Sequence, residues 1–227
     1  MIMNDKELVA IHAAKYVQND MLVGLGTGST ANFFIQELAR RQTEEGLKVT
    51  TVASSVVSTI KAQSLGLNVV AIEHISTIDL YVDGADEVTP DMILLKGRGY
   101  DLVKEKLLAK SAKLFIVVAD KSKLVDRIGT NYPIPIEVIS SAWKMTKHSI
   151  EMAGGHGDLR QNVAKDGLCI SSHGSLILDM VFSNTLHGAA LNHLLNNIPG
   201  VVEHGIFSGL AHTILIAADG KVEVRQK

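Results

Sequence analysis

The glycine-rich stretch at residues 23–34 (VGLGTGSTANFF) restricts the fold of this chain more than any other feature. A strand-like apolar run, Met21–Leu25, leads into three glycines within five residues, and Ser29 and Thr30 follow them. Apolar side chains then recur with the spacing of one helix face, at Ala31, Phe34, Ile35, Leu38 and Ala39. A strand, a tight turn and an amphipathic helix in this order are typical of a parallel α/β sheet.

The first half of the chain repeats this alternation. A helix is predicted near residues 5–17, and further strand-like runs lie at residues 49–53, 68–72, 80–83, 92–95 and 114–119. From about Tyr132 the predicted order is a strand (134–139), a helix (141–153), two strands (about 158–163 and 176–182), a helix (184–197) and a strand (201–207). That β-α-β-β-α-β order indicates a ferredoxin-like unit.

A last strand at residues 212–217 is expected to return to the first sheet. The fold class is therefore α/β: an open parallel-sheet, Rossmann-like domain with an inserted, smaller α+β (ferredoxin-like) domain. We predict the Rossmann-like domain over residues 1–128 and 208–227, and the smaller domain over 129–207. Pro133, Pro135 and the turn at residues 126–131 mark the predicted boundary.

Composition narrows the class of partner. The 227 residues hold 22 Lys and Arg against 24 Asp and Glu without a long run of one charge, which argues against nucleic-acid or membrane-surface binding and favours a small molecule. No apolar stretch approaches the ~18 residues that cross a bilayer. Cys169 is the only cysteine, and the N-terminal sequence lacks the regions of a signal peptide, so we expect a cytoplasmic location.

Ligands of parallel sheets bind at the carboxyl ends of the strands, and three unusual loops are expected there: GTGST, DGADE and KGRG. In the first, glycines let the backbone approach an anion, while Ser29 and Thr30 are expected to cap the helix, so a phosphate fits. The alternative is a tight turn that binds nothing. A dinucleotide fits less well, because Ser29 replaces the third glycine of GxGxxG, and Ser54 and Ser55 stand at the end of the next strand where an NAD-binding acid is expected. An NTP fits less well because the Walker lysine is missing.

The second loop places Asp83, Asp86 and Glu87 within five residues. Crowded carboxylates raise the pKa of at least one member, which suits proton transfer near neutral pH. Two alternatives remain open: a helix capped by Asp86 with Glu87 solvated, and a divalent-cation site.

The third loop, residues 96–99, leads into a helix that contains Glu105 between two lysines. Val103 and Leu107 share a helix face, and Glu105 lies about 200° from Val103 at ~100° per residue, so it is not expected in the core. Its alternative role is an exposed partner of the neighbouring lysines. Lys96 would supply a cation beside the acidic groups.

The ordered set GTGST, YVDGADE, KGxG with a following EK pair, ADKSK, PIPIEV and NNIPGVVEHGIF resembles type A ribose-5-phosphate isomerases over nearly the whole chain. The resemblance implies an enzyme that interconverts ribose 5-phosphate and ribulose 5-phosphate without metal or organic cofactor, as a homodimer or homotetramer. It implies Glu105 as the catalytic base. The implied substrate-contacting residues are Thr27, Gly28, Ser29, Thr30, Asp83, Gly84, Ala85, Asp86, Lys96, Gly97, Arg98, Gly99 and Lys123, with Lys6 as a weaker candidate.

In that chemistry one carboxylate, Glu105, moves a hydrogen between C1 and C2 through a cis-enediol. Lys96 and loop N–H groups stabilise the developing negative charge, and Asp83 or Asp86 opens the furanose ring by proton transfer. Two other functions are kept as alternatives: a non-catalytic sugar-phosphate sensor or paralogue, and a CoA-transferase or sugar-phosphate deaminase on a similar fold.

The chain departs from the family pattern where Arg98, Tyr100 and Asp101 replace a run of glycine and alanine. Arg98 would point outward, attract phosphate or narrow the pocket, and Asp101 would raise the pKa of Glu105 if the two approach. Cys169 is expected to pack as a small hydrophobe. The nine histidines lack a metal-ligand spacing, so no zinc is expected.

Overall fold

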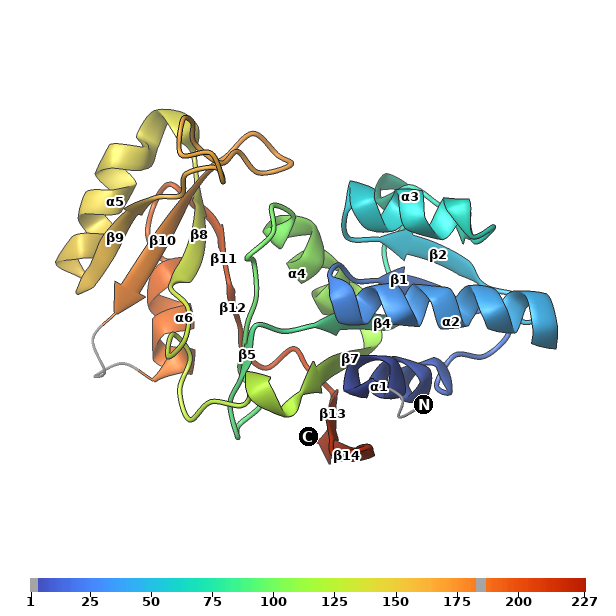
Figure 1. Ribbon diagram of the computed structural model, residues 1–227. Helices are drawn as coiled ribbons and strands as arrows, with labels where there is room; N and C mark the ends of the chain where they lie inside the picture. Colours follow the sequence, from blue (N-terminus) through green and yellow to red (C-terminus); the bar gives the residue numbers. More distant parts are fainter. Residues whose placement is uncertain (1–3, 183–186) are drawn as a thin grey trace. The chain divides into compact units, whose positions relative to one another are not determined.

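The computed structural model describes residues 4–182 and 187–227 (Figure 1). The chain forms two compact units: Met1–Ala85, Lys104–Lys123 and Leu210–Lys227 in the first, and Asp86–Val103 and Leu124–Gly209 in the second. This division groups residues 86–103 with the second unit, and the predicted domain limits at 128/129 and 207/208 stay a prediction. Within the described ranges, none of the helices combines the length and the apolar character that crossing a bilayer requires.

The first unit is built on a seven-stranded sheet in the order β14-β13-β7-β4-β1-β2-β3. Its elements are α1 (Asp5–Ala14), β1 (Leu22–Leu25), α2 (Ser29–Glu45), β2 (Thr50–Ala53), α3 (Val56–Ser64), β3 (Asn68–Val69), a 3-10 turn (Ile72–His74), β4 (Ile78–Gly84), most of α4 (Leu102–Ser111), β7 (Ala112–Asp120), a 3-10 turn (Lys121–Lys123), β13 (Thr213–Ala218) and β14 (Lys221–Gln226). All neighbouring strands are parallel except β14, which pairs antiparallel with β13. The return of the last predicted strand to this sheet is confirmed.

Helices α1 and α2 lie side by side and pack against the sheet (Figure 1). The apolar face predicted for α2 is confirmed, because Ala31, Phe34, Ile35, Leu38 and Ala39 are all buried. Phe34, Ile35, Leu38 and Ala39 share one core with apolar side chains of the sheet. Burial of this face, at about 25 cal/mol per Å² of apolar surface, stabilises the helix behind the glycine turn.

The strand order places a topological switch point between β1 and β4. From β1 the chain runs outward through β2 and β3, and it then returns to the other side of β1 as β4. The turns that follow β1 and β4 therefore diverge at the carboxyl edge of adjacent parallel strands, where ligands bind in such folds. Residues 26–30 and 83–84 lie at this point.

The second unit holds two antiparallel sheets. Its elements are β5 (Glu87–Val88), β6 (Leu94–Leu95), β8 (Ile134–Val138), a 3-10 turn (Ser140–Ala142), α5 (Trp143–Met152), β9 (Gly155–Leu159), β10 (Leu176–Phe182), α6 (Gly188–Asn196), β11 (Val201–His204) and β12 (Ile206–Phe207). The four-stranded sheet has the order β11-β8-β10-β9, and α5 and α6 share a core with it (Figure 1). The predicted ferredoxin-like β-α-β-β-α-β order is confirmed.

Several sequence-based expectations were wrong in detail. Residues 92–95 do not add a strand to the parallel sheet, because β6 belongs to a three-stranded sheet of order β12-β6-β5. The predicted strand 201–207 is two strands, of which β11 joins the four-stranded sheet and β12 the three-stranded one. The strand predicted at 158–163 lies earlier, as β9. Residues 184–186 of the predicted helix 184–197 lie outside the described residues.

Candidate active site

The turn after β1 opens directly onto the N-terminus of α2. Gly28 is the N-cap residue, with a φ of 113° that residues other than glycine rarely adopt. The predicted capping by Ser29 and Thr30 was wrong, since both lie inside the first helical turn and no side chain makes a cap hydrogen bond. The N–H groups of that turn and the positive end of the helix dipole are thus available to an anion.

A lysine from another helix reaches this turn. Lys6, in the first turn of α1, places Nζ 3.1 Å from Oγ of Ser29, as a hydrogen-bond donor. The structure therefore brings the weaker sequence candidate to the predicted phosphate loop. The ammonium group and the positive end of the helix dipole lie at the same place, and together they favour binding of a doubly negative phosphate group.

A cluster of side-chain hydroxyl groups forms hydrogen bonds with the turn. Oγ1 of Thr27 lies 2.9 Å from Ser54 Oγ, 2.7 Å from Ser55 Oγ and 3.2 Å from Ser58 Oγ. Ser58 also donates to the carbonyl oxygen of Gly26 at 2.7 Å. The sequence drew attention to Ser54 and Ser55 only as replacements for an NAD-binding acid. Their place in this cluster depends on the pairing of β1 with β2 and was not predicted.

Asp83 lies beside the same turn, on β4, and is fully buried. Its carboxylate accepts hydrogen bonds from Thr27 N at 3.1 Å, Gly84 N at 2.7 Å and the Tyr81 hydroxyl at 2.5 Å. A Cβ atom on Gly26 would fall 2.2 Å from Asp83 Oδ1. Glycine at position 26 therefore allows the turn and the carboxylate to touch.

Tyr81 is a member of this group that the sequence did not reveal. It is fully buried and stacks on Phe115 with ring centroids 5.0 Å apart. Burial raises the pKa of its phenol well above the usual value, and the charges of Asp83 and Glu105 raise it further. The hydroxyl therefore stays protonated and donates to Asp83.

Glu105, on α4, is buried, with 6% of its surface exposed. The exposed alternative for this residue was wrong. The helix face was also predicted wrongly, because Leu107 is 53% exposed while Leu102, Leu108 and Ala109 are buried with Glu105. A carboxylate on the buried face of a helix, acting electrostatically on the Tyr81 phenol, is a candidate for proton transfer.

The remaining acids of the DGADE loop belong to the second unit. Asp86 does not cap a helix, since β5 begins at Glu87. Glu87 is not solvated either: it is fully buried and accepts hydrogen bonds from the amides of Gly129, Asn131 and Tyr132 at 2.6, 2.5 and 3.1 Å. Glu87 thus anchors residues 129–132, and Asp86, which is half-buried, stays the candidate for proton transfer.

Lys96 follows β6 and is buried, with 4% exposed. Its ammonium lies 5.7 Å from the ring centroid of Phe207, and its amide donates to the carbonyl of Gly205 at 2.9 Å. Arg98 is exposed, and its guanidinium stacks 4.2 Å from the centroid of the Tyr132 ring. The side chain of Arg98 is therefore occupied within the second unit.

The last sequence candidates have simpler surroundings. Lys123 ends the 3-10 turn after β7, in the first unit, and is half-buried. Asp101 precedes α4 and accepts a hydrogen bond from Ser172 Oγ at 2.5 Å. Cys169 is buried, as expected, and contacts Gln161 O at 3.1 Å.

The first unit therefore gathers an anion-receptive turn, Lys6, Asp83 and Glu105, and the second holds Asp86 and Lys96. Residues 50–221 match the family model of ribose 5-phosphate isomerase A (phosphoriboisomerase A). The chain belongs to the ribose 5-phosphate isomerase A family. The family resemblance expected from the sequence motifs is confirmed.

Relatives of this family cover almost the whole chain. The ribose-5-phosphate isomerase A of Methanothermobacter thermautotrophicus is 43% identical, over 95% of this chain and 94% of the relative. A solved ribose 5-phosphate isomerase A from Methanocaldococcus jannaschii matches with a TM-score of 0.92 at 37% identity, covering 98% of both chains. A solved D-ribose-5-phosphate isomerase in complex with phospho-erythronic acid matches with a TM-score of 0.94 at 35% identity, covering 99% of this chain and all of the other.

Proposed function

We propose that this chain is an aldose-ketose isomerase that interconverts D-ribose 5-phosphate and D-ribulose 5-phosphate, a step of the non-oxidative pentose phosphate pathway. The relatives carry this activity in their names, and one was solved with phospho-erythronic acid, a four-carbon acid phosphate. The observation that carries the proposal is the burial of Glu105 in the same unit as the anion-receptive turn at residues 26–30.

Glu105 is the proposed catalytic base. Its carboxylate takes the hydrogen from C2 of the open-chain aldose as a proton, and the electrons of the C–H bond form a cis-enediolate with the negative charge on O1. The hydroxyl proton of O2 passes to O1, and the same carboxyl returns its proton to C1, which leaves the carbonyl group at C2. Its burial keeps water from competing for that proton. No metal or organic cofactor takes part in the proposed step.

The other site residues are proposed to bind the substrate, to open its ring and to stabilise the negative charge of the enediolate. Lys96 is proposed to stabilise the enediolate oxygen, and Asp83 or Asp86 to open the furanose ring by proton transfer to its oxygens. The turn Thr27–Thr30, with Lys6, is proposed to bind the 5-phosphate. The proposed sugar contacts are Gly84, Ala85, Gly97, Arg98, Gly99 and Lys123.

The substitution Glu105→Gln tests this function. It keeps the shape of the side chain and removes the base, so turnover of ribose 5-phosphate should fall about 10²–10⁴-fold while phospho-erythronic acid still binds. Glu44→Gln, on the exposed side of α2, is the matched control and should keep full turnover. A chelator should leave the wild-type rate unchanged.

Three results would count against the proposal. Normal turnover by Glu105→Gln would remove this residue from the chemistry. Wild-type protein that binds the sugar phosphate without isomerising it would be a sensor, and ammonia release from an amino sugar phosphate would indicate a deaminase.

Assembly and location extend the proposal. We propose a homodimer or homotetramer in the cytoplasm, since the resemblance implies a homo-oligomer. Light scattering of the purified chain gives the number of subunits, and a monomeric mass would contradict this part of the proposal.

A further inference from the structure

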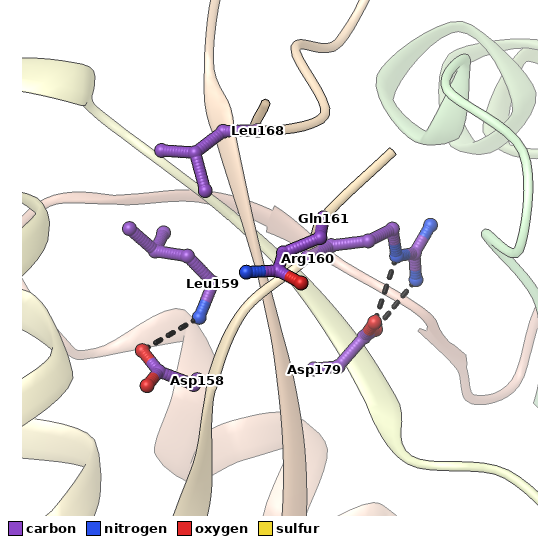
Figure 2. Close-up of a pocket in the computed structure, with 6 residues that line it drawn as sticks. All are labelled: Asp158, Leu159, Arg160, Gln161, Leu168 and Asp179. Atoms are coloured by element: carbon purple, nitrogen blue, oxygen red, sulfur yellow. Dashed lines mark hydrogen bonds and ion pairs between the residues drawn. The ribbon is translucent and has the colours of Figure 1, made fainter. Parts of the chain in front are cut away.

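One arginine of the second unit holds the backbone of the loop that follows Lys96. Arg160 comes directly after β9, and 14% of its side chain is exposed. Its Nε donates to Asp179 Oδ2 at 2.8 Å, and its Nη2 donates to Asp179 Oδ1 at 2.5 Å (Figure 2). This two-point ion pair fixes the plane of the guanidinium, because both donors of one edge meet both carboxylate oxygens.

The third nitrogen of the guanidinium meets three carbonyl groups in succession. Nη1 of Arg160 lies 3.1 Å from the carbonyl oxygen of Gly97, 3.3 Å from that of Arg98 and 3.2 Å from that of Gly99. Three consecutive peptide groups therefore turn their oxygens toward one cation. The positive charge of the guanidinium offsets the mutual repulsion of these carbonyl dipoles.

The orientation of these carbonyls fixes the orientation of the next three amides. The chain has no cis peptide bond in its described part, and in a planar trans peptide the N–H points opposite to the C=O. The amides of Arg98, Gly99 and Tyr100 therefore point away from Arg160. Within residues 4–182 and 187–227, none of these three amides donates to a backbone carbonyl group. Successive N–H groups of this kind form an anion-binding concavity.

Other contacts fix the ends of this loop. The amide of Lys96 donates to Gly205 O at 2.9 Å, and the amide of Ser172 donates to Tyr100 O at 3.0 Å. A Cβ atom on Gly97 would lie 2.9 Å from the side chain of Leu102. Arg160 thus holds the backbone carbonyls in the middle of the loop, between two anchored ends.

We propose that Arg160, held by Asp179, is a positioning residue that orients the peptide groups of residues 97–99 so that the amides of residues 98–100 face an anionic oxygen of the reacting sugar. The inference rests on the proposed function, because it takes the loop 96–99 as part of the substrate site. Arg160 itself touches neither the substrate nor Glu105 in this scheme. It acts through the backbone.

Arg160→Lys is the direct test. One ammonium cannot bind both oxygens of Asp179 and reach three carbonyls, so kcat for ribose 5-phosphate should fall about 10- to 100-fold, the loss that misplacement of a contact by an ångström brings. Phospho-erythronic acid should bind less tightly, whereas inorganic phosphate, which needs only the turn at residues 26–30, should bind as before. Arg225→Lys, at an exposed ion pair with Glu223, is the matched control and should change none of these.

Trypsin provides a readout that needs no catalysis. Arg98 is an exposed cleavage site in the held loop, and release of the loop should speed cleavage after Arg98 about tenfold in Arg160→Lys, with little change at other sites. Asp179→Asn, which frees the guanidinium without removing it, should show the same pattern more weakly. This second variant decides the matter if Arg160→Lys does not fold.

The outcomes separate the inference from the proposed function. If the wild-type chain fails to isomerise ribose 5-phosphate, the proposed function is wrong, and the cleavage rate alone judges whether Arg160 holds the loop. Unchanged kcat and unchanged cleavage in both variants would overturn the inference. A uniform loss of phosphate binding, analogue binding and thermal stability would also overturn it, because it would show a general structural role.

Discussion

Tyr81 donates its phenolic hydrogen to Asp83, two residues further along β4, with the oxygens 2.5 Å apart. Residues i and i+2 of a strand share one face, so the strand itself sets this pair. Asp83 also accepts hydrogen bonds from the amides of Thr27 and Gly84, which fixes one of its oxygens against the turn at residues 26–30. The carboxylate that is proposed to open the sugar ring is therefore oriented by β1 and β4 together.

Tyr81→Phe should weaken catalysis while leaving the fold intact. It removes a hydrogen bond to a charged group, worth about 1.5–3 kcal/mol, and it adds no new volume to the core. We expect kcat/KM to fall about tenfold or more, measured with ribose 5-phosphate. Tyr16→Phe, on a half-buried tyrosine away from Asp83, is the control. Equal kcat/KM for the two variants would show that the Tyr81 hydroxyl does not serve Asp83 in the reaction.

Gly26→Ala should damage both stability and activity. The new methyl group would lie 2.2 Å from Oδ1 and 2.6 Å from Cα of Asp83, so β1 and β4 must separate at their carboxyl ends. We expect a loss of about 1–3 kcal/mol, which lowers the melting temperature by about 2–4 °C per kcal/mol for a chain of this size. Gly167→Ala is the control, because its methyl group meets only the end of the Asn162 side chain, at 3.3 Å. A melting curve of Gly26→Ala that overlays the wild type would contradict the close approach.

Glu137, on β8, should make stability depend on pH. Burial raises the pKa of its carboxyl above the usual 4.5. Between the usual and the raised pKa the folded protein binds more protons than the unfolded chain, so this group lowers stability as pH rises through that window and has no such effect below 4.5. Glu137→Gln removes this loss, so the free energy of unfolding of the variant should increase relative to that of the wild type as pH rises through this window.

Urea unfolding at a series of pH values measures that difference. Glu73→Gln, at an exposed glutamate on the 3-10 turn before β4, is the control and should show no such growth. A gain for Glu137→Gln that stays constant from pH 4 to pH 8 would show that Glu137 does not titrate as its burial predicts.

The strand-turn-helix at residues 21–45 was predictable because its signals are local. Glycines that permit the turn, and an apolar face at the helical period, are properties of neighbouring residues. The buried position of Glu105 was not predictable, because the periodicity of α4 indicated that Val103 and Leu107 form the apolar face. Tertiary contacts reversed that face, and Leu107 is exposed.

Contacts between distant segments could not be predicted either, because they too depend on tertiary structure. Arg160 meets the carbonyl of Gly97 across 63 positions, and although Gly97 belongs to the KGRG motif, no local pattern marks Arg160. The sequence pattern placed Tyr81 in a buried apolar strand and indicated no further role for it. The two residues of β6 are too few for periodicity to tell a parallel strand from an antiparallel one, so the third loop was assigned to the wrong sheet.

Lys6→Gln should weaken phosphate binding without slowing the chemical step. Nζ of Lys6 lies 3.1 Å from Ser29 Oγ at the N-terminus of α2, so its charge adds to that of the helix dipole. Because the phosphate does not react, its binding is the same in the ground state and the transition state, and loss of one cation should raise KM about tenfold while kcat stays near the wild-type value. The inhibition constant of inorganic phosphate should rise in parallel, and added salt should narrow the gap between the two proteins. Lys15→Gln removes an exposed lysine at the other end of α1 and serves as the control. A fall in kcat with unchanged KM would instead place Lys6 at the reacting carbons, against its observed position beside Ser29.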